Sequence, residues 1–126
     1  MNSTTGILND DGTVVTNSGA YAFSHGYQTA AKGRGSVALG RDTIATDEFQ
    51  TVIGSFNDPT VKNARFVVGT GDKANNLKNG FIVYKDGRAA VLADPINDMD
   101  LATKQYVDNN TPEEFIAFID INADTT

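Results

Sequence analysis

Polar and apolar residues alternate in short runs between Ala20 and Gly54, and the runs recur every seven residues. Cut at this period, the chain reads AYAFSHG, YQTAAKG, RGSVALG, RDTIATD and EFQTVIG. Alternation with a spacing of two is typical of β-strands. A fixed short period predicts stacked repeats rather than a globular domain with a catalytic cleft. We therefore expect a protein that is not an enzyme.

Each seven-residue unit closes on glycine or aspartate, residue types that tolerate positive φ. A chain that turns at every seventh residue needs such types at that spacing. The predicted turn positions are Gly26, Gly33, Gly40, Asp47 and Gly54.

The alternating positions within the units fall into two sets. The third and fifth positions are mostly small and are predicted to fill a narrow interior: Ala22, Ser24, Thr29, Ala31, Ser36, Ala38, Thr43, Ala45, Gln50 and Val52. The residues at the fourth and sixth positions are bulkier in every other unit, which gives a super-period of fourteen residues. This super-period predicts coils of fourteen residues, each with two strands back to back. Their larger members form an outward apolar stripe: Phe23, Val37, Leu39 and Ile53. Exposed to water, this stripe would promote aggregation, so we expect it to pack against symmetry-related chains in a trimer.

The pattern changes after the repeat region, residues 19–58. Residues 59–93 predict a small β-module, with strands at 64–71 and 80–84 and a hairpin turn at 85–88 before a third strand. Residues 1–18 are polar and turn-rich, and are interpreted as an N-terminal arm or a simple lead-in.

Residues 94–110 predict a short helix, with Asp98 or Asp100 as its cap and an apolar stripe that includes Met99, Ala102 and Tyr106. We expect these three residues to extend the trimer interface. Residues 111–126 form an apolar C-terminal segment, for which we expect burial against a partner or continuation into a longer protein.

Three strings resemble known families. GSVALG at residues 35–40 resembles the SVAIG/SVALG repeat in the head of trimeric autotransporter adhesins, a left-handed parallel β-roll assembled as a trimer. DLATKQYVD at residues 100–108 resembles the ATKxYVD element of phage tail-fibre and appendage proteins, where it starts a short trimeric helical segment. FVVGTG…NGFIVYKDG resembles a β-module of phage fibre and baseplate proteins. The resemblances imply an all-β dominated fold: a trimeric left-handed β-roll, a small β-module and a short C-terminal helix or coiled-coil segment.

These resemblances favour a homotrimeric structural component of a bacteriophage tail or head fibre, carried on the virion with other virion proteins and contributing to host attachment. The alternative is a fragment of a bacterial trimeric autotransporter adhesin, located outside the cell or on its surface. A third interpretation, a carbohydrate-active tailspike piece, needs clustered acidic residues that segment 19–58 hardly offers.

Composition narrows the range of binding partners that this chain could have. The net charge is −6 and the ten basic residues are scattered, which disfavours nucleic acid. No apolar run approaches the roughly 18 residues of a membrane span, so we expect no membrane insertion, and the N-terminus does not have the pattern of a signal peptide. Cysteine is absent, which excludes disulfides and thiolate chemistry.

Few residues suggest site chemistry. The sole histidine, His25, is either a polar tip in an irregular first coil or a metal or anion ligand where three copies meet. The acidic turns at residues 10–12 and 86–87 lack the pattern of calcium loops. We expect no catalytic, cofactor or metal site. Four aromatic residues either pack between coils or stack on a host glycan: Tyr21, Tyr27, Phe49 and Phe56.

Overall fold

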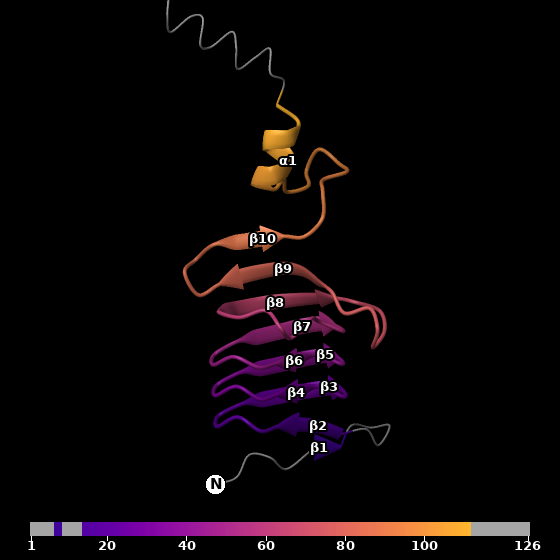
Figure 1. The fold of residues 1–126 in the computed structure, drawn as a ribbon. Helices are drawn as coiled ribbons and strands as arrows, with labels where there is room; N and C mark the ends of the chain where they lie inside the picture. The colour runs from indigo at the N-terminus through magenta and orange to yellow at the C-terminus, as the bar shows by residue number, and fades with distance from the viewer. Residues whose placement is uncertain (1–6, 9–13, 112–126) are drawn as a thin grey trace, which may run out of the picture. The chain divides into compact units, whose positions relative to one another are not determined.

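The computed structural model describes residues 7–8 and 14–111, and the chain divides into two units, Met1–Leu92 and Ala93–Thr126 (Figure 1). Most of the structure is β, and one short helix lies in the second unit. Among the described residues, no helix has the length and apolarity needed to span a bilayer.

The first unit is a parallel β-solenoid of about three turns, built from two sheets. The narrow sheet has the order β1-β2-β4-β6 and contains β1 (Ile7–Leu8), β2 (Val14–Asn17), β4 (Ala30–Ala31) and β6 (Ile44–Ala45). The broad sheet has the order β10-β9-β8-β7-β5-β3 and contains β3 (Phe23–Tyr27), β5 (Val37–Arg41), β7 (Thr51–Ser55), β8 (Ala64–Thr70), β9 (Asn79–Tyr84) and β10 (Ala89–Val91).

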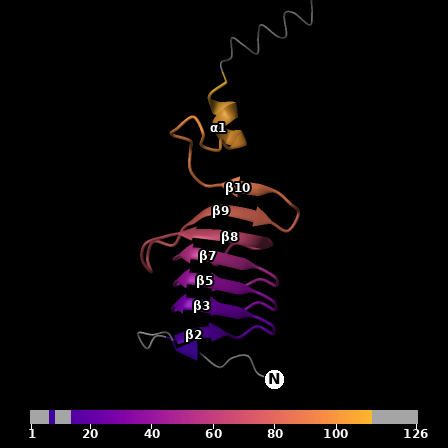
Figure 2. The ribbon, with the colours of Figure 1, turned by 180° about the vertical axis from the view of Figure 1, so that it is seen from behind.

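Strand pairing confirms the fourteen-residue coil. In the broad sheet, Phe23 of β3 pairs with Val37 of β5 and Val37 with Thr51 of β7, and both strand pairs are parallel. In the narrow sheet, Ala30 pairs with Ile44 at the same offset. Figures 1 and 2 show the resulting rungs stacked one on another. Each coil therefore contributes one strand to each sheet, as the super-period predicts.

The regular coils end after β7. β8 still pairs with β7 in parallel, but with Thr51 opposite Phe66, one residue more than the coil length. β9 and β10 then add antiparallel strands at the same edge. The strands predicted at 64–71 and 80–84 are present as β8 and β9, but with β10 they extend the broad sheet of the solenoid. The hairpin between β9 and β10 turns at Gly87, where φ is +93°.

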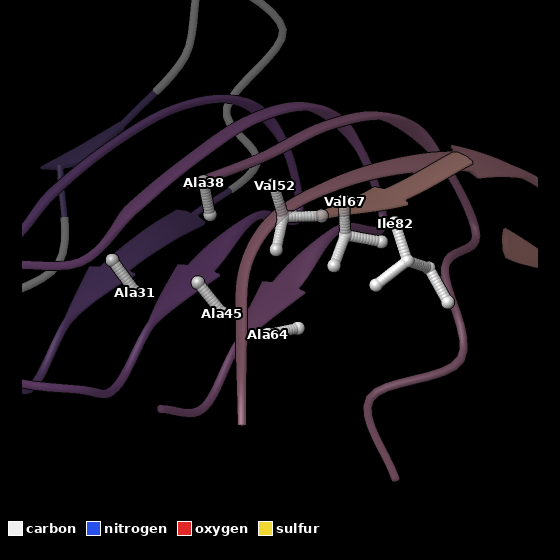
Figure 3. Packing of buried hydrophobic residues seen from close by; sticks show 7 residues of the cluster. All are labelled: Ala31, Ala38, Ala45, Val52, Ala64, Val67 and Ile82. Atoms are coloured by element: carbon white, nitrogen blue, oxygen red, sulfur yellow. The ribbon is translucent and has the colours of Figure 1, made fainter. Parts of the chain in front are cut away.

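The interior is filled by the small residues predicted for it. Nine of the ten predicted interior residues are buried, and Ala22 packs partly buried against the core. Figure 3 shows Ala31 and Ala45 from the narrow sheet opposite a row from the broad sheet: Ala38, Val52, Val67 and Ile82. Coils this thin leave room only for Ala, Ser and Thr, and larger side chains enter only near the β8–β9 end.

The turn positions need a correction. Gly26, Gly40 and Gly54 have positive φ, but Gly33 and Asp47 do not. Left-handed residues instead recur two positions after each unit closes, at intervals of seven: Tyr21, Gln28, Gly35, Asp42, Phe49, Phe56 and Asn63. Glycine is needed at position 33 for another reason, because a Cβ there would lie 2.1 Å from the Asp47 carbonyl oxygen of the next coil.

The helix cap also needs a correction. α1 (Lys104–Asn109) is capped by Thr103, whose hydroxyl accepts a hydrogen bond from the Tyr106 amide at 3.0 Å. Asp100 lies before the helix, where its carboxylate accepts hydrogen bonds from the amides of Ile96 and Asn97. The bonds from the Asn97 and Ile96 amides lower the pKa of Asp100, and Asp100 lies three residues before the capping position.

The terminal predictions are tested in part. Within the predicted N-terminal arm, residues Val14–Asn17 form β2. The turn at residues 9–12 and the apolar segment after Thr111 lie outside the described residues.

Candidate interaction surfaces

The outer face of the broad sheet carries two apolar columns, which we call the outer columns. Cross-strand pairing aligns one member per strand in each column. The first column, in sheet order, is Phe23, Val37, Thr51, Phe66, Val83 and Ala89. The second column is His25, Leu39, Ile53, Val68, Phe81 and Val91.

Most residues of the outer columns are half-buried by their neighbours, while Phe23 at the end of the sheet is 52% exposed. The Phe66 and Phe81 rings meet edge to face, with centroids 6.3 Å apart. Four adjacent strands of this sheet, β3, β5, β7 and β8, are parallel. Parallel sheets are normally covered on both faces, so this face has the character of an interface.

The structure brings the predicted stripe together. Phe23, Val37, Leu39 and Ile53 all lie in the outer columns, and His25 pairs with Leu39 as the register predicts. The other residues expected at an interface are in the second unit. Met99 is 93% exposed and, like the exposed Ala102, precedes the helix; Tyr106 is half-buried within α1.

The outer side of the narrow sheet is different. On β4 and β6, whose side chains the structure describes, the outward residues are the half-buried Ala30 and Ile44, with Lys32 and Thr46 beside them. The Thr46 hydroxyl donates to the Pro59 carbonyl at 3.3 Å, which places the loop after β7 against this side. These two strands therefore offer much less apolar surface than the broad sheet.

The four predicted glycan-contact aromatics do not share one environment. Tyr21 is 87% exposed, Phe49 is 53% exposed and Tyr27 is 36% exposed. Phe56, by contrast, is buried, as in the packing alternative. The reason is local: the Lys78 amide donates to the Phe56 carbonyl at 3.0 Å, and the Arg41 guanidinium lies 5.4 Å from the ring centroid.

A groove of about 550 Å³ lies beside Phe49, at the strand ends of the broad sheet where β8 begins and β9 ends. We call it the corner groove. The lining residues that matter below are Asp47, Glu48, Phe49, Lys62, Arg65 and Lys85. The sequence gives Phe49 as one of four aromatics that either pack between coils or contact a glycan. It gives no signal for Lys62, Arg65 and Lys85, because the long connection after β7 and the β9–β10 hairpin bring these cations together.

A second groove of about 390 Å³ shares Asn63 and Lys85 with the corner groove and extends to Tyr84 and Arg88. The Arg88 guanidinium lies 4.5 Å from the Tyr84 ring centroid and bonds the Asp86 carboxylate at 2.8 Å. That bond lowers the pKa of Asp86 and raises the pKa of Arg88.

The described residues contain no group of three or more His, Cys, Asp or Glu side chains that could hold a metal ion. Comparison with protein-family models, curated proteins and solved structures gives no match to this chain. The chain is thus defined by its architecture: a β-solenoid with an apolar outer face on one of its two sheets.

Proposed function

We propose that this chain is a non-enzymatic, homotrimeric component of a bacteriophage fibre that presents or supports attachment to the host surface. The observation that carries the proposal is the pair of outer columns, which runs across all six strands of the broad sheet. A second copy of the chain is the partner of matching chemistry, since an apolar sheet face is best covered by another apolar face.

Three-fold assembly is supported by the place of the sequence resemblances in the fold. The GSVALG string forms β5 and the turn before it, at the centre of the stacked coils. In the adhesin heads that it resembles, such rolls are left-handed and trimeric, and we propose the same winding and assembly here. The ATKQYVD string, which covers all of α1 but its last residue, is the part that favours a phage fibre over an adhesin.

The proposed mechanism is mechanical and multivalent. Burial of the outer columns among three chains makes unfolding of one chain depend on separating it from the other two. Three copies of any binding surface then act together, so weak single contacts give strong attachment. A fragment of a trimeric autotransporter adhesin remains the second candidate, because GSVALG suits it equally; a membrane-barrel segment in the flanking sequence would favour it.

Light scattering on the purified chain, coupled to size exclusion, tests the assembly. We expect three times the chain mass, unchanged on dilution. A stable monomer or a dimer would contradict the trimer, and with it the main support for a fibre function.

A further inference from the structure

We propose that the corner groove binds an acidic oligosaccharide, with its carboxylates on the groove's cations and a sugar face on Phe49. This inference deepens the proposed attachment function and rests on it. None of the groove residues named above belongs to the outer columns, so a trimer formed through that face would carry three such grooves.

The charges of the corner groove are not balanced within it. The Asp47 carboxylate accepts a hydrogen bond from the Asn63 amide at 2.8 Å, and Glu48 lies 3.9 Å from Arg34. Neither Lys62 nor Lys85 has a carboxylate within 4.0 Å among the described residues. In a chain of net charge −6, two lysines without carboxylate partners in one groove form a specific place for an anion.

The aromatic ring is held in position. Phe49 has a left-handed backbone, with φ of 56°, which is uncommon for a large side chain. Its ring lies over Gly35, where a Cβ would come within 2.7 Å of the ring, and the guanidinium groups of Arg34 and Arg65 each lie 5.9 Å from its centroid. The ring nevertheless stays half exposed, so it offers an apolar surface with a fixed orientation.

Arg65 is fixed as well, because its Nη1 donates to the Glu48 carbonyl at 3.1 Å. The site thus combines a half-exposed ring that lies against Gly35, a guanidinium bonded to the Glu48 carbonyl, and two lysines. Carboxylates form strong charge-assisted hydrogen bonds with such cations. The continuation towards Tyr84 and Arg88 gives room for more than one sugar unit.

A nucleic acid fits this surface less well. A continuous line of phosphates needs clustered positive charge, whereas Asp47, Glu48 and Asp86 interrupt the cations along the edge. Those same oxygens, together with Asn63, are suitable hydrogen-bond partners for sugar hydroxyl groups.

Calorimetric titration of the purified full chain tests the proposal with four probes: a short oligogalacturonate, a maltooligosaccharide of equal length, oligoglutamate and oligothymidylate. We expect the oligogalacturonate to bind at least about tenfold more tightly than each of the others, a difference of about 1.4 kcal/mol. Equal binding of the neutral sugar, the acidic peptide or the DNA would overturn the assignment to an acidic saccharide.

Paired variants locate the site. Replacing Lys62 and Lys85 together by alanine should weaken oligogalacturonate binding about tenfold. The same change at Lys73 and Lys78, in the loop at the other edge of the broad sheet, removes equal charge and should leave binding unchanged. Equal losses in the two double variants, or no loss in the first, would overturn the site.

Phe49→Gly removes the ring while keeping the left-handed turn, because glycine already occupies the matching position 35. It should also weaken binding, with an unchanged circular dichroism spectrum. A variant that binds like the parent chain would show that the ring is structural. If the chain is trimeric but binds no saccharide, only this inference fails; a monomeric chain instead contradicts the proposed fibre function.

Discussion

The two sheets of the solenoid end in different ways. The narrow sheet stops at β6, and a side chain takes the place of the next strand: the Asn57 amide oxygen accepts from the Ile44 amide at 2.8 Å, and its nitrogen donates to the Ile44 carbonyl at 3.0 Å. Gln50 accepts from the Thr46 amide nearby, at 3.0 Å. The broad sheet has no such closure, because it continues through β8, β9 and β10.

An open β edge can pair with other chains, and at β6 the amide groups of Asn57 close this edge of the narrow sheet. The broad sheet gains three strands instead, and with them a larger outer face. Inside the coil the two sheets are similar, because both present small side chains: serine and alanine on the broad side, threonine and alanine on the narrow side. The seven-residue repeat therefore reflects the common interior, whereas the fourteen-residue super-period reflects the difference between the two outer faces.

The largest effect is expected where the coils stack. A Cβ at Gly33, after a narrow-sheet strand, would lie 2.1 Å from the Asp47 carbonyl oxygen, and one at Gly40, in the broad sheet, 2.0 Å from that of Gly54. Gly33→Ala and Gly40→Ala should each lower the free energy of unfolding by about 3 kcal/mol or more, measured by urea denaturation. Similar losses would show that both sheets stack equally closely.

Gly87→Ala is the control for these two variants. Gly87 also has positive φ, but a Cβ there would have nothing within 4 Å. Its replacement should cost only about 1–2 kcal/mol, from the left-handed backbone alone. A loss as large as that of Gly40→Ala would mean that glycine is required at these positions by the backbone conformation and not by the close approach of the coils.

The two outer faces are compared by placing the same charge on each. Leu39→Glu in the outer columns should convert the proposed trimer to monomer, because burying a carboxylate without a partner costs several kcal/mol. Ile44→Glu, on the outer side of the narrow sheet, should leave the mass unchanged. Light scattering measures both variants, and equal behaviour would remove the distinction between the faces.

The closure of the narrow sheet is tested at Asn57. Asn57→Ala leaves the Ile44 amide and carbonyl unpaired, and should cost about 2–3 kcal/mol of unfolding free energy. Asn57→Asp keeps the acceptor but sets a carboxylate against the Ile44 carbonyl. The stability of this variant should therefore improve on acidification, which protonates the new carboxyl group. Asn75→Ala, in an exposed loop, is the control and should have almost no effect; a tolerated Asn57→Ala would show that β6 needs no closure.

The repeat made much of this fold predictable. Interior positions such as Ala38 and Thr43 could be identified because alternation and period together fix which side chains point inward. The left-handed turns were missed by two positions, because Phe49 and Phe56 occupy them and large aromatic residues do not indicate positive φ. Gly33 was identified correctly as special, but for the wrong reason.

Features that depend on contacts between distant residues were not predictable. Asn57 looks like an ordinary turn residue until the chain brings it beside Ile44. Lys62 and Lys85 are separated by two strands in sequence and meet only because β9 runs antiparallel to β8. The helix cap was misplaced because Asp98 and Asp100 are both good capping residues in the sequence, while it is the Thr103 hydroxyl that lies at the first turn.

The smallest effect concerns Asp58, in the loop that carries the chain from Asn57 to β8. The Thr60 hydroxyl donates to its carboxylate at 2.6 Å and the Thr60 amide at 3.0 Å, and these bonds lower the pKa of Asp58 below its usual value of 3.8. A carboxyl group with a lowered folded-state pKa stabilises the fold above its unfolded pKa, and this contribution is lost as the pH falls through the folded value.

Urea midpoints recorded from about pH 7 to about pH 3 should thus decline at the acid end. Asp58→Asn keeps an acceptor for Thr60 but cannot titrate, so its decline should be slightly shallower, while its stability at neutral pH falls a little because the charged acceptor is lost. If the two proteins gave superimposable acid curves, the Asp58 carboxylate would not stabilise the loop between Asn57 and β8, where the narrow sheet ends and the broad sheet continues.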